Sequence, residues 1–439
     1  MKKFLLVLAI AALATTQFTG CGRSNEPDVS DLLAEMLGSE AMAILGSGLG
    51  DVGQSINQHA ADMATTTTRP TAAPTTTAPT TTTQPIPTTT QPPEPEETRP
   101  PFPPIVTVDT GGRHTMGLTA SGELWMWGSN GEGRLGTGDD TSRQHPINIM
   151  SNIVAISAGG SYSAAINDRG MLYTWGSNEY NQLGDGTRTN RDTPTQVLNN
   201  VIYVSAGADH MAAITADGRL WVWGRNWHGQ VGDGTTINRN EPVHVMDDVI
   251  AVSAGMNHTL ALTSDGVLWG FGDNDNGQLG INDRTSRHQP IEIMSNVTAI
   301  SAGSHSMAIT EGGTLWGWGR NAEGQVGQGN SNNRQLTPAR IMDNVKFVSS
   351  TWATSMAVRD DGSLWMWGLN TNGQVGDGSI TNRTSPVRVL DNVVTAATSF
   401  GHSVAIQDDD SVWAWGINSN GQLGDGTEVY QRRPIRICE

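Results

Sequence analysis

Histidine is the residue type whose spacing in this sequence first suggests chemistry. In a repeat of about 48 residues, one position holds Tyr162 and Thr354 in two copies and a histidine in five, namely His114, His210, His258, His305 and His402. Ligand nitrogens must lie about 2 Å from a metal ion, whereas equivalent atoms of adjacent packed sheets lie about 10 Å apart. We therefore expect no metal ion to be shared between these side chains, and we interpret them as partners in structural hydrogen bonds.

Loops rich in Asp are the second group of residues that could bind a metal ion. The segment 273–277 reads Asp-Asn-Asp-Asn-Gly, like the start of a calcium loop, but its Gly comes one position early and Arg284 stands where such a loop needs a bidentate Glu. Asp-Gly pairs such as Asp185-Gly186 predict tight turns instead. An Arg also recurs close before a repeated Pro, as in Arg191 and Pro194. We expect these Arg side chains to pair with Asp across the long loop of each repeat.

The residue types do not favour catalysis or nucleic-acid binding. Ser, His and Asp are abundant, but none forms a nucleophile elbow, a His-Glu-x-x-His pair or a phosphate loop. We therefore expect no enzymatic activity and no cofactor. The chain has 26 Lys and Arg against 43 Asp and Glu, a formal charge of −17, and residues 105–439 alone hold 21 basic and 33 acidic groups, a charge of −12. Nucleic-acid binding needs clustered positive charge, so this balance excludes it.

Large apolar side chains outside the repeat pattern are the candidates for a binding site. The position after the first strand of each repeat holds, in order, Gly112, Gly160, Ala208, Met256, Ser304, Trp352 and Phe400. Trp227 and Tyr180 also stand outside the repeated aromatic positions. Strands of a meander alternate in direction, so the loops after the first and third strands leave the same face. We expect that face to bind a ligand through Trp352, Phe400, Met256, Trp227 and Tyr180; local packing beneath the loops is the alternative.

The sixth repeat departs furthest from the pattern. Its segment 350–354 reads Ser-Thr-Trp-Ala-Thr and lacks the Gly and the His that most other repeats carry there. When one repeat lacks the turn residues that the other repeats keep, the residues that replace them are expected to have a local function that offsets the loss. We therefore expect the binding site to be centred on repeats five to seven.

The elements that position these residues follow from the repeat itself. Pro recurs every 48 residues, at Pro146, Pro194, Pro242, Pro290, Pro338, Pro386 and Pro434. A Gly follows each of seven aromatic residues, Trp127, Trp175, Trp223, Phe271, Trp318, Trp367 and Trp415, and an Asn lies two positions after each of those Gly residues. The seven repeats fill the domain as 105–152, 153–200, 201–248, 249–296, 297–344, 345–392 and 393–439.

Each repeat contains the pattern of four short strands. In the fourth repeat they are expected at 250–253, 259–263, 267–272 and 291–293, with turn residues between them. Pairs such as Trp221 and Trp223 lie two residues apart, so both rings share one face of the third strand and must pack against a neighbouring sheet. With 52 Gly and 14 Trp, the composition suits a turn-rich all-β protein. The expected fold is a seven-bladed β-propeller of four-stranded blades.

The segments 254–262, 265–274 and 277–280 together resemble the regulator of chromosome condensation repeat family, and matching segments cover the whole of 105–439. The resemblance implies a seven-bladed propeller used mainly as a protein-binding platform. The founding member of the family is a nuclear guanine-nucleotide exchange factor for a small GTPase. A secreted bacterial relative inhibits β-lactamases through loops on one face. We do not carry the exchange activity over, because a protein outside the cytoplasm meets no such GTPase.

The N-terminus predicts export. Lys2 and Lys3 precede an apolar run from Phe4 to Ala14, which is too short for a transmembrane helix and fits a signal peptide over residues 1–20. The sequence Phe-Thr-Gly-Cys at 18–21 resembles the lipobox of bacterial lipoproteins, although Leu is usual where Phe18 stands. The resemblance implies that Cys21 carries a diacylglyceryl group. The alternative is ordinary cleavage after Ala14, which leaves Cys21 free or paired with Cys438.

Two segments separate this N-terminus from the repeats. Residues 21–64 predict weak helices near the membrane, and residues 65–104, rich in Thr and Pro, predict an extended stalk. We therefore expect a monomeric, lipid-anchored binding module that faces the extracytoplasmic side and contacts the membrane only through its anchor. Its partner is an unknown extracellular protein. Recognition of a glycan or cell wall, with Trp352 and Trp227 as stacking platforms, and inhibition of an extracellular enzyme are the alternatives.

Overall fold

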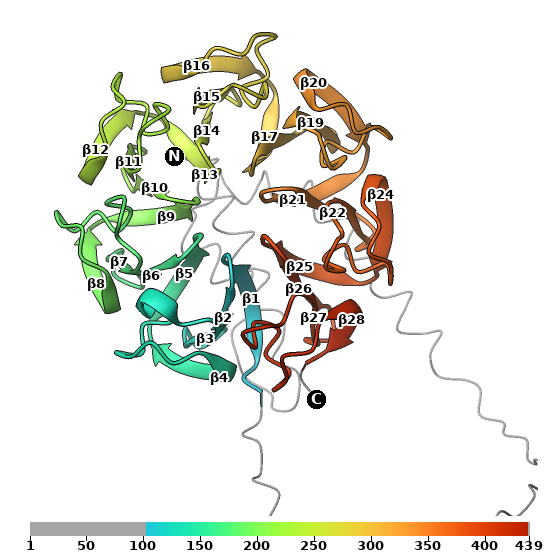
Figure 1. Cartoon of the computed structure of the whole chain (residues 1–439). Coiled ribbons are helices and arrows are strands. Elements are labelled where there is room, and N and C mark those ends of the chain that lie inside the picture. The colour runs from blue at the N-terminus through green and yellow to red at the C-terminus, as the bar shows by residue number, and fades with distance from the viewer. Residues whose placement is uncertain (1–101, 438–439) are drawn as a thin grey trace, which may run out of the picture. The chain divides into compact units, whose positions relative to one another are not determined.

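The computed structural model describes residues 102–437, which form seven four-stranded antiparallel sheets. These sheets, called blades 1 to 7 in chain order, stand in a ring around a central channel (Figure 1). Each blade is a meander of four consecutive strands, with the first strand beside the channel and the fourth at the rim. The seven-bladed β-propeller of four-stranded blades predicted from the sequence is confirmed.

The strand bounds are regular from blade to blade. Blades 1 and 2 contain β1 (Ile105–Thr110), β2 (His114–Thr119), β3 (Leu124–Gly128), β4 (Arg143–Met150), β5 (Ile153–Ala158), β6 (Tyr162–Asn167), β7 (Leu172–Gly176) and β8 (Arg191–Leu198). Blades 3 and 4 contain β9 (Val201–Ala206), β10 (His210–Thr215), β11 (Leu220–Gly224), β12 (Arg239–Met246), β13 (Val249–Ala254), β14 (His258–Thr263), β15 (Leu268–Gly272) and β16 (Arg287–Met294). Blades 5 to 7 contain β17 (Val297–Ala302), β18 (His305–Thr310), β19 (Thr314–Arg320), β20 (Arg334–Met342), β21 (Val345–Ser350), β22 (Thr354–Arg359), β23 (Leu364–Gly368), β24 (Arg383–Leu390), β25 (Val393–Thr398), β26 (His402–Gln407), β27 (Val412–Gly416) and β28 (Gln431–Arg436). A short 3-10 helix, η1 (Gly131–Gly133), lies between β3 and β4.

The fourth strand of blade 4 is longer than its sequence pattern indicated. In blade 4, the expected strand at 291–293 is the second half of β16, which begins at Arg287. Gly272 pairs with Arg287 after a register shift that follows the pairing of Gly270 with Ile291. This irregularity breaks the alternation of apolar and polar residues that marks a strand. The first half of the strand therefore carried no signal in the sequence.

The cores of the propeller lie between neighbouring blades. In each blade the aromatic residue that precedes the Gly of the third strand is completely buried; these are Trp127, Trp175, Trp223, Phe271, Trp318, Trp367 and Trp415. Trp223 of blade 3 packs against Leu172 and Leu183 of blade 2, and half-buried Trp221 packs against the same cluster. The indole N–H of Trp223 also donates to the carbonyl oxygen of Gln182, at 3.1 Å. Both aromatics of the pair therefore serve one interblade layer, as the spacing predicted.

The ring closes between blades 7 and 1 without an exchanged strand. Each of these blades is built from its own four consecutive strands. The hydroxyl of Thr115 donates to the carbonyl oxygen of Gln422 at 2.8 Å, and its oxygen lies 2.9 Å from Nε2 of His402. Phe102, just before β1, meets the ring of Trp127 edge-on at 5.9 Å. Side-chain packing and hydrogen bonds therefore close the propeller at this junction.

The repeated histidines form hydrogen bonds between blades, as the sequence predicted. In each case Nε2 lies within 2.6–2.9 Å of a Ser or Thr hydroxyl in the next blade around the ring, in the pairs His114–Ser163, His210–Thr259, His258–Ser306, His305–Ser355 and His402–Thr115. Burial lowers the pKa of every one of these rings, to about 3 in His210, His258, His305 and His402. The imidazoles are therefore neutral at physiological pH and belong to the architecture.

The long loop between the third and fourth strands is held by two repeated side chains. In all seven blades, the side-chain oxygen of the repeated Asn accepts the backbone N–H five residues later, as Asn178 does from Leu183 at 3.1 Å. In five blades the predicted Arg–Asp pair is present, as in Arg191–Asp185 at 2.6 Å. These contacts fix the base of each loop, so the loop tips are free to differ.

Several predictions from the sequence fall on residues outside the described range. They concern the signal peptide at 1–20, the lipidated Cys21, the segment 21–64, the stalk as far as residue 101, and Cys438. Within residues 102–437, no helix has the length and apolar character that a membrane span needs.

Candidate functional site

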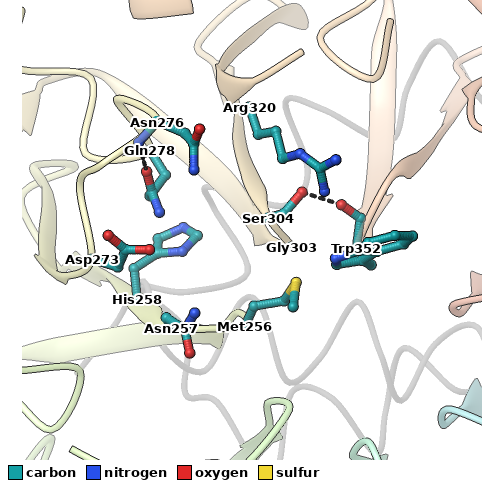
Figure 2. A pocket seen from close by; sticks show the side chains of 10 residues that line it. All are labelled: Met256, Asn257, His258, Asp273, Asn276, Gln278, Gly303, Ser304, Arg320 and Trp352. Carbon is teal, nitrogen blue, oxygen red and sulfur yellow. Dashed lines mark hydrogen bonds between the residues drawn. The ribbon is translucent and has the colours of Figure 1, made fainter. Parts of the chain in front are cut away.

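The loops after the first and third strands share one face of the propeller, called the loop face. A pocket on it joins residues from both kinds of loop (Figure 2). Met256 and Trp352 come from loops after first strands, and Asp273 and Asn276 come from the loop after the third strand of blade 4. The shared face inferred from strand direction therefore holds for Met256 and Trp352.

Trp352 and Phe400 form one aromatic pair at the mouth of the central channel. Their rings stack at a centroid distance of 4.8 Å with an angle of 26° between the planes. Both residues line the channel, as does Met256. Phe400 is 49% exposed, whereas Trp352 is half-buried. The exposed anchor of this pair is thus the Phe rather than the larger Trp.

Apolar side chains that sequence reasoning missed extend this pair. The position directly after the repeated aromatic-Gly pair holds, in order, Ser129, Ser177, Arg225, Asp273, Arg320, Leu369 and Ile417. The backbone N–H of Leu369 donates to the carbonyl oxygen of Ala353, next to Trp352, at 2.8 Å. Ile417 packs against the loop of Phe400, because a Cβ atom placed on Gly401 would lie 2.3 Å from its Cδ1.

We call Trp352, Phe400, Leu369 and Ile417 the apolar sector. It belongs to blades 6 and 7, where two positions of the repeat become apolar together. The change at the second position, from Ser in blades 1 and 2 to Leu and Ile in blades 6 and 7, was the signal that could have revealed it from the sequence.

Tyr180 and Trp227 form a separate cluster in blades 2 and 3. Their rings meet edge-on at 5.5 Å. The guanidinium of Arg225 lies 4.2 Å from the Trp227 ring centroid and pairs with Asp209 at 2.9 Å. Trp227 is 54% exposed. Within residues 102–437, none of the ring contacts or pockets described above joins this cluster to Trp352, so the five candidate residues form two groups rather than one.

The unusual sequence of blade 6 has a packing explanation. In blade 2, a Cβ atom on Gly159 would lie 2.4 Å from Cε1 of Tyr162, so this ring needs Gly beside it. Blade 7 differs, because Ser399 stands at the Gly position and its hydroxyl lies 2.8 Å from Nδ1 of His402. In blade 6 the ring is replaced by Thr354, whose hydroxyl donates to the carbonyl oxygen of Leu369 at 3.2 Å. The smaller side chain lets Thr351 stand in place of Gly. The two exchanges in blade 6 have a local packing explanation, and they alone do not indicate a binding site.

The pocket of Figure 2 has a volume of about 280 Å³ and mixes apolar and polar walls. Arg320 lies 5.1 Å from the Trp352 ring centroid and pairs with Glu323 at 2.7 Å. Residues 102–437 contain no group of three or more His, Cys, Asp or Glu placed to hold one metal ion. The pocket therefore offers apolar contacts, hydrogen-bonding groups and charged side chains, which are the interactions that a ligand-binding site uses.

Comparison with known proteins agrees with this architecture. A family model described as RCC1-like domain matches residues 48–349 and 198–439. The chain belongs to the RCC1-like domain family. RCC1-like propellers are commonly protein-interaction modules rather than enzymes.

Two solved structures illustrate the shared fold. Human WBSCR16 superposes with a TM-score of 0.65 at 20% identity, covering 72% of this chain and 94% of that chain. Prp20p of Saccharomyces cerevisiae, described with its binding to Gsp1p and histones, superposes with a TM-score of 0.63 at 24% identity, covering 70% of this chain and 84% of that chain.

A curated relative shares one repeat's length with this chain. The RCC1 domain-containing protein RUG3, mitochondrial, of Arabidopsis thaliana is 42% identical over 48 residues, which is 11% of each chain. The match thus spans about a tenth of that relative.

Proposed function

We propose that this RCC1-like propeller is an extracytoplasmic, lipid-anchored module that binds a protein partner on its loop face, over the apolar sector. The observation that carries the proposal is the half-exposed ring of Phe400 stacked on Trp352 at the channel mouth. An aromatic anchor surrounded by further apolar and polar residues is typical of interface hot spots. Leu369 and Ile417 supply the apolar surround, and Arg320 supplies a charge at its border.

A protein partner fits this surface better than a glycan. Sugar stacking needs an open face of an aromatic ring, and Trp352 is contacted by Phe400 from blade 7 and by Arg320 from blade 5. One face of the Trp227 ring is also covered, because the guanidinium of Arg225 lies over it. The ring that remains open to a partner is Phe400, a side chain without a hydrogen-bonding group for sugar hydroxyls.

The location of the module rests on the N-terminal sequence. The short apolar run, the Gly20-Cys21 pair and the Thr/Pro-rich segment are typical of an exported lipoprotein on a stalk. Two acyl chains on one Cys give stable anchoring where a single chain does not. The Cys21→Ser protein is therefore expected in the soluble fraction of fractionated cells. Retention of this variant in membranes would show that the anchor is elsewhere.

The binding face is tested by comparing two positions at the ends of one strand. Phe400 follows β25, and Val394 lies near its start with a similar exposed fraction of 50%. Full-length protein is used to capture proteins from the extracytoplasmic fraction, in parallel with its Phe400→Ala and Val394→Ala variants. A central aromatic anchor contributes about 2 kcal/mol or more, roughly thirtyfold in affinity.

We expect a partner that the wild type and the Val394→Ala variant retain and the Phe400→Ala variant loses. Equal capture by both variants would place the interface elsewhere. Binding to a glycan array that survives Phe400→Ala, without any captured protein, would favour the glycan alternative.

A further inference from the structure

The pocket between blades 4, 5 and 6 contains a carboxylate, that of Asp273, which forms no ion pair within residues 102–437. Its apolar wall is formed by Met256 and Trp352, and its polar wall by Asp273, Asn276 and Gln278 of blade 4 (Figure 2). Its volume of about 280 Å³ suits one long side chain rather than a whole cofactor. The walls therefore match a ligand group that has an apolar stem and a polar end.

Asp273 is a buried residue. It is only 7% exposed, and its Oδ1 accepts the backbone N–H of Asp275 at 2.9 Å. Within residues 102–437, no Lys, Arg or His side chain forms an ion pair with it. Asp273 lines the pocket, and its carboxylate can accept a further, charge-assisted hydrogen bond from a cationic group that a ligand supplies.

Blade 3 shows how the same two positions are filled when the charge is balanced. Arg225 stands in the position of Asp273, and Asp209 stands in the position of Asn257. The guanidinium of Arg225 and the carboxylate of Asp209 pair at 2.9 Å. Blade 4 has Asp273 in place of the Arg and Asn257 in place of the Asp, so the guanidinium that pairs with the carboxylate in blade 3 has no counterpart there.

The basic group that lies in the pocket is already paired. Arg320 forms an ion pair with Glu323 at 2.7 Å and lies over the Trp352 ring. Its position also shows that the Trp352 wall accepts a guanidinium at short range. Asp273 and Arg320 are the charged residues that line the pocket. Because Arg320 is paired with Glu323, Asp273 is the lining charge without an ion-pair partner among the described residues, in a propeller domain of net charge −12.

We propose that this pocket receives a lysine or arginine side chain of the protein partner, with Asp273 as its counter-ion. The aliphatic stem lies along Met256 and the part of Trp352 that lines the pocket beside Phe400 and Arg320. The charged end reaches the Asp273 carboxylate and the amide of Asn276. This inference rests on the proposed protein-binding function and adds that the partner presents a basic residue beside the apolar contact with Phe400.

The test uses small amides as probes of the pocket alone. N-acetyl-arginine methylamide and its lysine counterpart are titrated into the full-length protein, and the indole N–H signal of Trp352 is followed by NMR. The citrulline amide is the neutral isostere of arginine, and the glutamate amide carries the opposite charge. We expect saturable shifts with the basic amides and at least tenfold weaker binding of citrulline and glutamate, because a charge-assisted hydrogen bond is lost.

Two variants assign the effect to Asp273. The Asp273→Asn variant should bind the basic amides about tenfold more weakly. The matched control is Asp265→Asn, which removes one negative charge from the same blade in the turn between the second and third strands, and it should bind as the wild type does. The double variant Asp273→Arg with Asn257→Asp recreates the blade 3 pair, so it should fold and lose the site.

Preference for the glutamate amide would assign the pocket to anions through Arg320 and overturn the proposal. Equal binding of citrulline and arginine, or unchanged binding in Asp273→Asn, would overturn it too. The proposed function is tested separately. If the basic amides fail to bind while Phe400→Ala still abolishes capture of the partner, the pocket assignment falls and the protein-binding face stands.

Discussion

The interblade layers and the loop face are built from the same seven repeats, but they use repetition in opposite ways. In the layers, the buried aromatic recurs in all seven blades and the histidine hydrogen bond in five. On the loop face, the position after the aromatic-Gly pair carries Ser, Arg, Asp, Leu or Ile depending on the blade. A layer needs the same packing at every junction, whereas one binding site needs a surface that differs from blade to blade.

This difference separates two kinds of evidence within a single sequence. A side chain present in nearly every blade is explained by the closed ring, as the neutral, buried histidines show. A side chain that breaks the pattern needs its own explanation, which can be packing, as at Thr351 and Thr354, or an open contact surface, as at Phe400. The comparison predicts large effects on stability in the layers and small ones on the loop face.

Acid should unfold the propeller through its interblade histidines, and this is the largest expected effect. Burial holds the pKa values of four of these rings near 3, below the unfolded value of 6.5, so the unfolded chain binds more protons between these limits. The contribution of these neutral histidines to the free energy of unfolding is therefore fully present above pH 6.5 and is lost as the pH falls towards 3. When the pH is lowered from 7 to 5, each of these histidines lowers the free energy of unfolding by about 2 kcal/mol.

The pH effect can be assigned by denaturation at pH 7 and pH 5. Asp109 opposes the trend, because burial raises its pKa to about 6 and its contribution falls as the pH rises from 3.8 to 6. The opposing contribution comes from one carboxyl, whereas the destabilising one comes from five imidazoles. The His258→Gln variant should lose less stability between pH 7 and 5 than the wild type. A stability that is flat across this range would mean that the rings are hydrated or charged in the folded protein.

Two tryptophans of blade 3 allow a direct comparison of an interblade layer with the loop face. Trp223 is completely buried in an interblade layer, and Trp227 is exposed on the loop face. Trp223→Ala should cost about 3–5 kcal/mol through lost burial and a cavity. Trp227→Ala should cost less than about 1 kcal/mol, because surface changes are small. Thermal unfolding of both variants measures the difference; equal shifts in melting temperature would place Trp227 in the core.

The close approach of Gly159 to the ring of Tyr162 should appear as a coupling energy. Gly159→Ala forces a Cβ atom against the ring of Tyr162, and overpacking of this kind costs about 1–3 kcal/mol. In a Tyr162→Thr background the ring is absent, so the added cost of Gly159→Ala should largely disappear. The four proteins of this cycle are compared by chemical denaturation. Additive costs would show that Gly159 is needed for its backbone conformation rather than for the space beside Tyr162.

Much of the layer architecture was predictable from the sequence because periodicity carries it. The spacing of Trp221 and Trp223 placed both rings on one face of a strand, and the His position could be assigned to hydrogen bonds by distance alone. The full length of β16 was not predictable, since a register irregularity breaks the alternating pattern.

The candidate site was predictable only as a set of residues on one face. Strand direction placed Met256 and Trp352 together, but it could not show that Arg320 and Phe400 cover the Trp352 ring. These contacts join blades 5, 6 and 7 and depend on rotamers at the channel mouth. For the same reason, the sequence could not predict that Asp273 has no ion-pair partner among the described residues. Ion pairing depends on which side chains of the two loops meet.

The smallest expected effect concerns the Arg225–Asp209 pair of the loop face. Both side chains are partly exposed, and such ion pairs contribute about 0–1 kcal/mol. Asp209→Asn should therefore change the free energy of unfolding by less than about 1 kcal/mol, and added salt should shrink the difference further. Chemical denaturation at low and high salt measures it, with Asp265→Asn as the control for a lost charge elsewhere. A cost comparable to that of Trp223→Ala would mean that the loop-face contacts hold the ring together, and the division between a repeated core and a variable binding face would then fail in blade 3.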